Sequence, residues 1–201
     1  MKKKNQFIFT IAIVVCSAMC FIGCNKGSFE KKVEAVPLGT WVETKQESER
    51  DGKLYPMKYR ITGVDRDKAS VDKKIEEYNH SAMGNTIEPL ASGNLEYAVA
   101  EYEAYYPKDF PDDEFGITAV AVGFSIVSVE GKPDITVEGV KYKGLATTWE
   151  IGDPPMGYDF YSDSIYKGSI LFVMVKGNDE YVFVEKYNEN GKDVVHYTEG
   201  K

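Results

Sequence analysis

The chain has 201 residues, a length that suits one domain better than two. Its apolar fraction of 43%, with 14 Tyr and 10 Phe, is enough to build a core, which argues against global disorder. The formal charge is −8 at pH 7, and it becomes −11 without the three lysines of residues 1–23. A domain this acidic repels phosphate backbones, so no nucleic-acid partner is expected. Solubility is the plainest role of the charge.

The N-terminus has the pattern of a secretion signal. Three lysines directly after Met1 form a basic start, and residues 7–22 form an apolar run. This run is shorter than the roughly 20 apolar residues that a membrane span needs, and Gly23 follows where a small-residue cleavage site belongs. The sequence therefore predicts a signal peptide over residues 1–23.

Phe21-Ile22-Gly23-Cys24 resembles a lipobox, the site that lipoprotein signal peptidase reads, with Phe21 where Leu is usual. The resemblance implies that Cys24 becomes the mature N-terminus and carries a diacylglyceryl group, whose two chains anchor stably in a membrane. Residues 24–36 are then the lipidated cysteine and a polar tether. An ordinary signal peptide with an incidental cysteine is the alternative.

The mature chain lacks any cysteine after Cys24. The domain is therefore expected to fold without disulfides, and a thiol nucleophile is excluded.

Strands dominate the elements predicted along the mature chain, because residues alternate between apolar and polar or form short apolar runs. The predicted strands cover 37–42, 57–62, 95–106, 117–129, 136–142, 145–151, 169–176, 181–187 and 194–197. A charged run at 44–52 is expected to be mobile. Gly123 indicates a bulge or a bend.

One short helix is expected, capped by Ser70, with Val71, Ile75 and Tyr78 as its apolar stripe. Gly177-Asn178-Asp179 and Asn190-Gly191 predict turns near the C-terminus. Seven to nine strands at this spacing favour an all-β domain, a β-sandwich, over residues 37–201.

Several segments resemble the telokin-like group of immunoglobulin-like extracellular lipoproteins, which are common in low-GC Gram-positive bacteria. The resemblance is carried by the leader and by Pro37-Leu38-Gly39-Thr40-Trp41, Glu77-Tyr78-Asn79, Leu95-Glu96-Tyr97-Ala98-Val99 and Phe172-Val173-Met174-Val175-Lys176-Gly177. It implies an immunoglobulin-like sandwich on the extracellular face of the cell membrane. The function of the group is undefined, so the resemblance supplies no functional residues.

Catalytic motifs are weak in this sequence. His80 and His196 are not at metal-ligand spacing, and neither a G-x-S-x-G elbow nor a glycine-rich phosphate loop is present. Glu101 and Glu103 share one strand face, as paired catalytic carboxylates could, but this spacing usually marks a solvent face. The chain is therefore not expected to be an enzyme.

Two loops combine carboxylates with aromatic residues. Loop 107–115 offers four carboxylates as a weak calcium site, and loop 152–166 holds three more aspartates. The calcium candidates are Asp109, Asp112, Asp113 and Glu114. The partner-binding candidates are Phe110, Tyr158, Phe160 and Tyr161, because aromatic rings give large contact areas. The alternatives are a solvated charge cluster and rings that face the core.

These observations predict a non-enzymatic binding module at the cell surface, anchored by Cys24, with a protein or cell-envelope partner and no cofactor beyond weak calcium. A hydrolase or metal-dependent enzyme with an unrecognised site is one alternative, and an accessory subunit of an envelope complex is another. If the loops do not bind, the polar strand face with Lys58, Arg60 and Thr62 is the next candidate surface.

Overall fold

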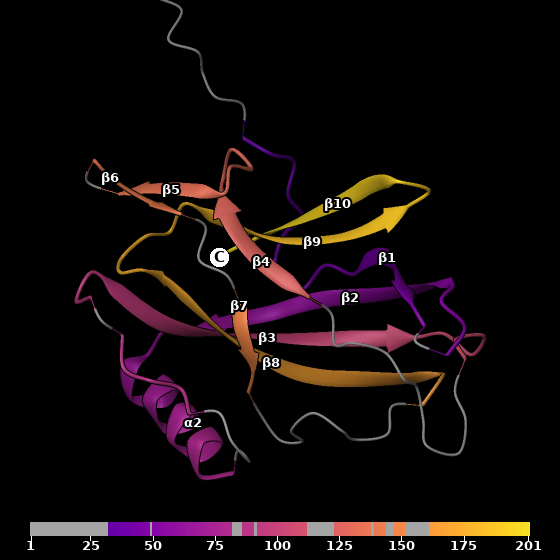
Figure 1. The fold of residues 1–201 in the computed structure, drawn as a ribbon, viewed down its shortest axis with the longest axis horizontal. Helices are drawn as coiled ribbons and strands as arrows, with labels where there is room; N and C mark the ends of the chain where they lie inside the picture. Colours follow the sequence, from indigo (N-terminus) through magenta and orange to yellow (C-terminus); the bar gives the residue numbers. More distant parts are fainter. Residues whose placement is uncertain are drawn as a thin grey trace, which may run out of the picture. The chain divides into compact units, whose positions relative to one another are not determined.

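Antiparallel strands make up most of the chain that the structure, a computed structural model, describes (Figure 1). The described residues are 32–48, 50–81, 86–90, 92–111, 123–137, 139–143, 147–151 and 161–201. All of them belong to one compact unit. The prediction of a mostly β domain with one helix is confirmed for these residues.

The largest sheet has five strands in the order β1-β2-β3-β8-β7. Its strands are β1 (Val42–Glu47), β2 (Leu54–Asp65), β3 (Leu95–Tyr106), β7 (Thr147–Glu150) and β8 (Ser164–Val175). Each neighbouring pair is antiparallel, and β2 has a bulge between Ile61 and Gly63. Strand β3 is central, and its bounds are those that the alternation predicted.

A second sheet has three strands in the order β10-β9-β4, and a separate hairpin joins β5 to β6. These strands are β4 (Phe124–Ser128), β5 (Asp134–Val137), β6 (Val140–Lys143), β9 (Tyr181–Glu189) and β10 (Lys192–Glu199). Asn190 and Gly191 both have positive φ, 54° and 79°, which a tight turn between two twisted strands requires. The predicted C-terminal hairpin is therefore confirmed.

Aromatic side chains join the two larger sheets. Tyr59 and Tyr102 of the five-stranded sheet contact Phe124 of β4, with ring centroids 5.0 and 5.4 Å apart. Phe172 contacts Phe183 of β9 at 5.4 Å. All five rings are buried. Edge-to-face pairs of this kind add about 0.5–1.5 kcal/mol each beyond the area that they bury.

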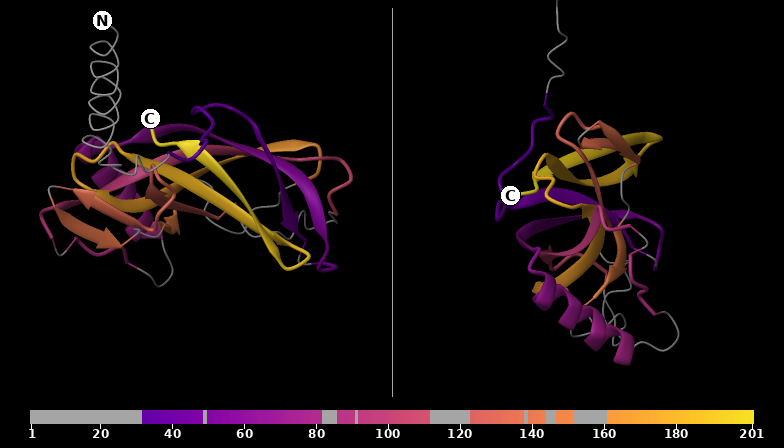
Figure 2. Two further views of the ribbon diagram at one scale, coloured as in Figure 1. Left: turned by 90° about the horizontal axis from the view of Figure 1, so that it is seen from above. Right: turned by 90° about the vertical axis from the view of Figure 1, so that its left-hand side faces the viewer.

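Helix α2 (Lys68–Ser81) packs on the other face of the five-stranded sheet, while β9 and β10 lie on the first face (Figure 2, right). Its buried residue Val71 clusters with Val99 and Leu171. The N-cap is Asp67, whose Oδ1 accepts the Ser70 N–H at 2.9 Å. Ser70 was therefore wrong as the expected cap, since a carboxylate three residues earlier already satisfies its amide.

The segment before β1 is already bonded to the domain. The Val33 N–H donates to the Val129 carbonyl at 2.8 Å, and the Val36 N–H donates to the Tyr197 carbonyl at 3.0 Å. Val36 also forms an isolated bridge with Thr198 of β10. The expected tether at 24–36 is thus part of the domain from Val33 onward.

Other sequence-based predictions are wrong. The predicted strand at 37–42 contains a turn at Leu38 and Gly39, and β1 instead occupies the charged run that was expected to be mobile. The predicted strand at 136–142 is the end of β5 and the start of β6, reversed at Gly139, which has a φ of 78°. Gly123 precedes β4, so it is no bulge within a described strand, and residues 117–122 of the predicted strand at 117–129 lie outside the described residues.

Candidate functional site

The face of the five-stranded sheet on which α2 packs continues past the helix at one end of the sheet, where it forms an outward surface. Side chains at alternate positions of β2, β3 and β8 point away from the aromatic core here, and the cross-strand pairs place Lys58 beside Tyr105 and Arg60 beside Glu103. On β8 the same rows continue to Ile165 and Lys167. We call this the open outer face: Trp41, Lys58, Arg60, Glu103, Tyr105, Ile165 and Lys167.

Two cations of the open outer face lie against aromatic rings. The Lys58 Nζ is 5.0 Å from the Trp41 ring centroid and 4.9 Å from that of Tyr105. The Arg60 guanidinium carbon is 4.6 Å from the Trp41 centroid. Cation–π contacts of this kind contribute about 0.5–1 kcal/mol at exposed sites, and here they fix three long side chains relative to one another.

Glu103 is the carboxylate at the centre of this face. Its Oε2 accepts hydrogen bonds from Arg60 Nε at 2.8 Å and from Arg60 Nη2 at 2.6 Å, and Lys167 Nζ lies 3.4 Å from its other oxygen. Arg60, and secondarily Lys167, hold the pKa of Glu103 below its usual value. Glu103 is therefore an ionised positioning group and a poor general acid.

Glu101, the other member of the suggested carboxylate pair, is also held by neighbours. Lys74 of α2 donates to its Oε1 at 2.6 Å, and Ser169 donates to its Oε2. Lys74 also lies 3.8 Å from Asp65. These contacts tie α2 to the sheet at the border of the open outer face. They favour a structural role for both glutamates over a glycosidase pair.

Two large exposed side chains lie at the start of β8 and just before it. The Ile165 side chain is 53% exposed, and Tyr161, just before β8, is 46% exposed. The Tyr105 hydroxyl donates to Asp163 Oδ1 at 2.9 Å, and this hydrogen bond raises the pKa of Tyr105. Asp163 adopts a φ of 61°, which is uncommon outside glycine and shapes the turn that leads into β8.

The structure describes two of the four predicted partner-binding residues, Phe110 and Tyr161. Phe110 is 1% exposed and contacts Tyr55 and Tyr106, so its prediction as a partner-binding residue is wrong. Tyr161 is exposed. The other two partner-binding candidates, Tyr158 and Phe160, lie outside the described residues, as do three calcium candidates: Asp112, Asp113 and Glu114.

The calcium prediction is not tested as a whole, because three of its four carboxylates are not described. Asp109, the described member, is exposed. Within the described ranges no three His, Cys, Asp or Glu side chains are grouped as a metal site would need.

The two histidines occupy different places. The His80 Nδ1 is 2.7 Å from the Glu76 carbonyl on the exposed side of α2. The His196 Nδ1 is 2.9 Å from Oε2 of the buried Glu185, which also accepts from the Thr44 hydroxyl at 2.9 Å. Thr44 and His196 thus share one acceptor and are not bonded as a nucleophile and its base. This cluster joins β1, β9 and β10.

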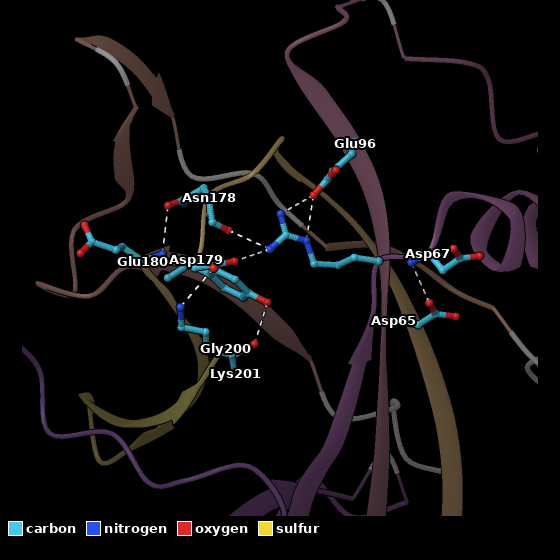
Figure 3. A network of polar contacts seen from close by, with 10 residues as sticks. Asp65, Asp67, Glu96, Asn178, Asp179, Glu180, Gly200 and Lys201 are labelled. Atoms are coloured by element: carbon cyan, nitrogen blue, oxygen red, sulfur yellow. Dashed lines mark hydrogen bonds and ion pairs between the residues drawn. The ribbon is translucent and has the colours of Figure 1, made fainter.

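A second polar network closes the opposite end of the sheet (Figure 3). Arg66 donates through Nε to Glu96 at 2.8 Å and through Nη1 to Asp179 at 2.7 Å. Lys201 donates to the other Asp179 oxygen at 3.1 Å, and Tyr181 donates to the Gly200 carbonyl at 2.8 Å. Burial raises the pKa of Tyr181 to about 12. These bonds fasten the C-terminus to the sheets.

The sequence placed Lys58 and Arg60 on a polar strand face but missed Trp41 and Tyr105 as part of it. Strand alternation was sufficient to group Lys58 with Arg60. The contribution of Trp41 depends on how β1 pairs with β2, since the chain before β1 brings its ring over both cations.

Comparisons with known proteins add no family. No family model, curated protein or solved structure matches the chain. In the part of the chain that the structure describes, no helix has the length and apolar character of a membrane span.

Proposed function

We propose that this chain is a lipid-anchored binding module on the extracellular face of the cell membrane, and that the open outer face is where its partner docks. The observation that carries the proposal is the cluster of two ring-bound cations beside the 53% exposed Ile165 on a sheet face. Aromatic rings and Arg are the residues most enriched in binding hot spots, and a rigid sheet holds them ready for contact.

The segment before β1 joins the domain away from the open outer face. Val33 and Val36 are bonded to the β4–β5 turn and to β10, on the side of the three-stranded sheet, and α2 lies on the other side of the five-stranded sheet (Figure 1). The docking surface that we propose therefore lies on the face of the five-stranded sheet opposite to the side on which Val33 and Val36 are bonded to the domain.

We also propose an immunoglobulin-like sandwich as the finer fold class. The aromatic contacts between the two larger sheets support it, as does the antiparallel pairing of their strands. A non-enzymatic role fits a surface whose carboxylates, Glu101 and Glu103, are neutralised by Lys74 and Arg60.

Site-specific photocrosslinking on intact cells tests this function. A photoreactive amino acid replaces Ile165 in one variant and Val140 of the β5–β6 hairpin, which is 51% exposed, in the control. We expect a discrete adduct from position 165 and not from position 140. Identical adducts from both positions, or none from position 165, would refute the open outer face as the docking surface.

A further inference from the structure

Lys58 holds a positive charge that no carboxylate of the described residues pairs. Its Nζ lies about equally far from two ring centroids, 5.0 Å for Trp41 and 4.9 Å for Tyr105. Among the described residues no carboxylate lies within ion-pair distance of it, and its N–H groups donate no hydrogen bond. An ammonium has three N–H donors, so these donors remain available to an acceptor from another molecule.

The carboxylates nearest to Lys58 on the sheet do not form ion pairs with it. Glu43 stands directly opposite it in the β1–β2 register, yet the two do not pair. The other two cations of the open outer face, Arg60 and Lys167, both bind Glu103. In a chain whose formal charge is −11 without residues 1–23, a lysine that lies between two rings and pairs with no described carboxylate is able to accept an external anion.

The surroundings decide what kind of anion fits. Ile165, next to Tyr105 in the β3–β8 register, is 53% exposed, and Tyr161 is 46% exposed. Exposed aliphatic surface favours an apolar protein side chain over a sugar ring. The net negative charge of the domain opposes a strongly acidic partner at long range, so a segment with a single carboxylate fits better than a polyanion.

We propose that the open outer face binds a partner-protein segment that places one carboxylate on Lys58 and apolar side chains on Ile165. This inference rests on the proposed function and names its partner chemistry. The rings hold the ammonium in place before binding, so little side-chain entropy is lost when the carboxylate arrives.

Peptide binding to the full chain in neutral detergent micelles tests the proposal. The probes are a short fluorescent Leu/Tyr peptide with one central Glu and the same peptide with Gln, measured by anisotropy. We expect wild type to bind the Glu peptide about ten-fold more tightly, the scale of a charge-assisted hydrogen bond. Lys58→Gln should lose this preference while it binds the Gln peptide as wild type does, and Lys58→Arg should retain it.

Lys176→Gln is the matched control, because Lys176 is exposed, is in no ion pair among the described residues, and lies away from this face. It should keep the full Glu preference. An unchanged preference in Lys58→Gln, binding of neither peptide, or Lys58-dependent binding of polygalacturonate instead of the Glu peptide would overturn the proposal. If the crosslink from position 165 forms while the Glu preference is absent, only the carboxylate recognition fails and the docking surface stands.

Discussion

Phe110 packs against Tyr55 and Tyr106 with ring centroids 5.5 and 4.9 Å apart, and its side chain is 1% exposed. Phe110→Ala would leave a cavity, so we expect the free energy of unfolding to fall by about 3–4 kcal/mol in urea titrations. Tyr161→Ala, at an exposed ring, should cost less than about 1 kcal/mol. Equal losses from the two variants would contradict the different burial of these rings.

Glu103 links stability to pH. Because Arg60 lowers its pKa in the folded state, its contribution is present above the unfolded pKa of about 4.3 and is lost as pH falls through the lower folded-state value. We expect Glu103→Gln to lower the free energy of unfolding by about 1 kcal/mol at pH 7, with the difference from wild type shrinking below about pH 4.

The matched control for this pH series is Glu43→Gln, at an exposed carboxylate of β1. It should follow wild type closely at each pH in denaturant titrations. A wild-type to Glu103→Gln difference that is the same at pH 7 and pH 3 would show that the ion pair does not set the effect.

At the scale of elements, β8 depends on a glycine that faces a ring. Gly168 is paired with Tyr102 across β3, and a Cβ built on it would lie 2.4 Å from atoms of that buried ring. We expect Gly168→Ala to destabilise the domain by about 2 kcal/mol in urea titrations, since the Tyr102 ring is buried and packs against Phe124 and Tyr166. Gly63, which lacks a positive φ and whose added Cβ would meet no atom within 4 Å, is the control: Gly63→Ala should be neutral or stabilise the domain by up to about 1 kcal/mol.

Where the residue pattern was regular, the sequence predicted the elements well. Strand β3 matches its prediction because small or aromatic residues occupy every second position from Ala98 to Tyr106, with Glu101 and Glu103 between them. Strand β1 was missed because charged residues at Glu43, Lys45 and Glu47 make the segment resemble a charged loop. Its inward side chains include the polar Thr44, which donates a hydrogen bond to the buried Glu185 instead of packing in an apolar core. In β1, tertiary contacts therefore outweigh the low β-propensity of the charged residues.

The hairpin of β5 and β6 was read as one strand, although Gly139 carries the signal that was overlooked. Its φ of 78° lies in the left-handed region that favours glycine, and it reverses the chain between Val137 and Val140.

For the candidate site, alternation grouped Lys58 with Arg60. The ring contacts of Trp41 and the burial of Phe110 depend on packing between segments far apart in sequence, which local pattern does not contain.

For the whole molecule, the proposed function depends on the anchor at Cys24. We expect Cys24→Ala to abolish incorporation of a fatty-acid analogue in metabolic labelling, because the thioether needs the Cys24 sulfur. Cys20→Ala, within the expected leader, is the matched control and should leave labelling unchanged. Equal labelling of Cys24→Ala and wild type would rule out lipidation at this position.

The most direct test of the central claim compares solvent accessibility on intact cells with that of purified protein in micelles. Hydroxyl-radical footprinting reports on Trp41, Tyr105 and Ile165 of the open outer face, with Val195 of β10, 37% exposed, as the reference. We expect labelling of the open outer face to fall on cells while that of Val195 does not. Unchanged labelling of the open outer face, with protection confined to Val195 or absent altogether, would contradict it.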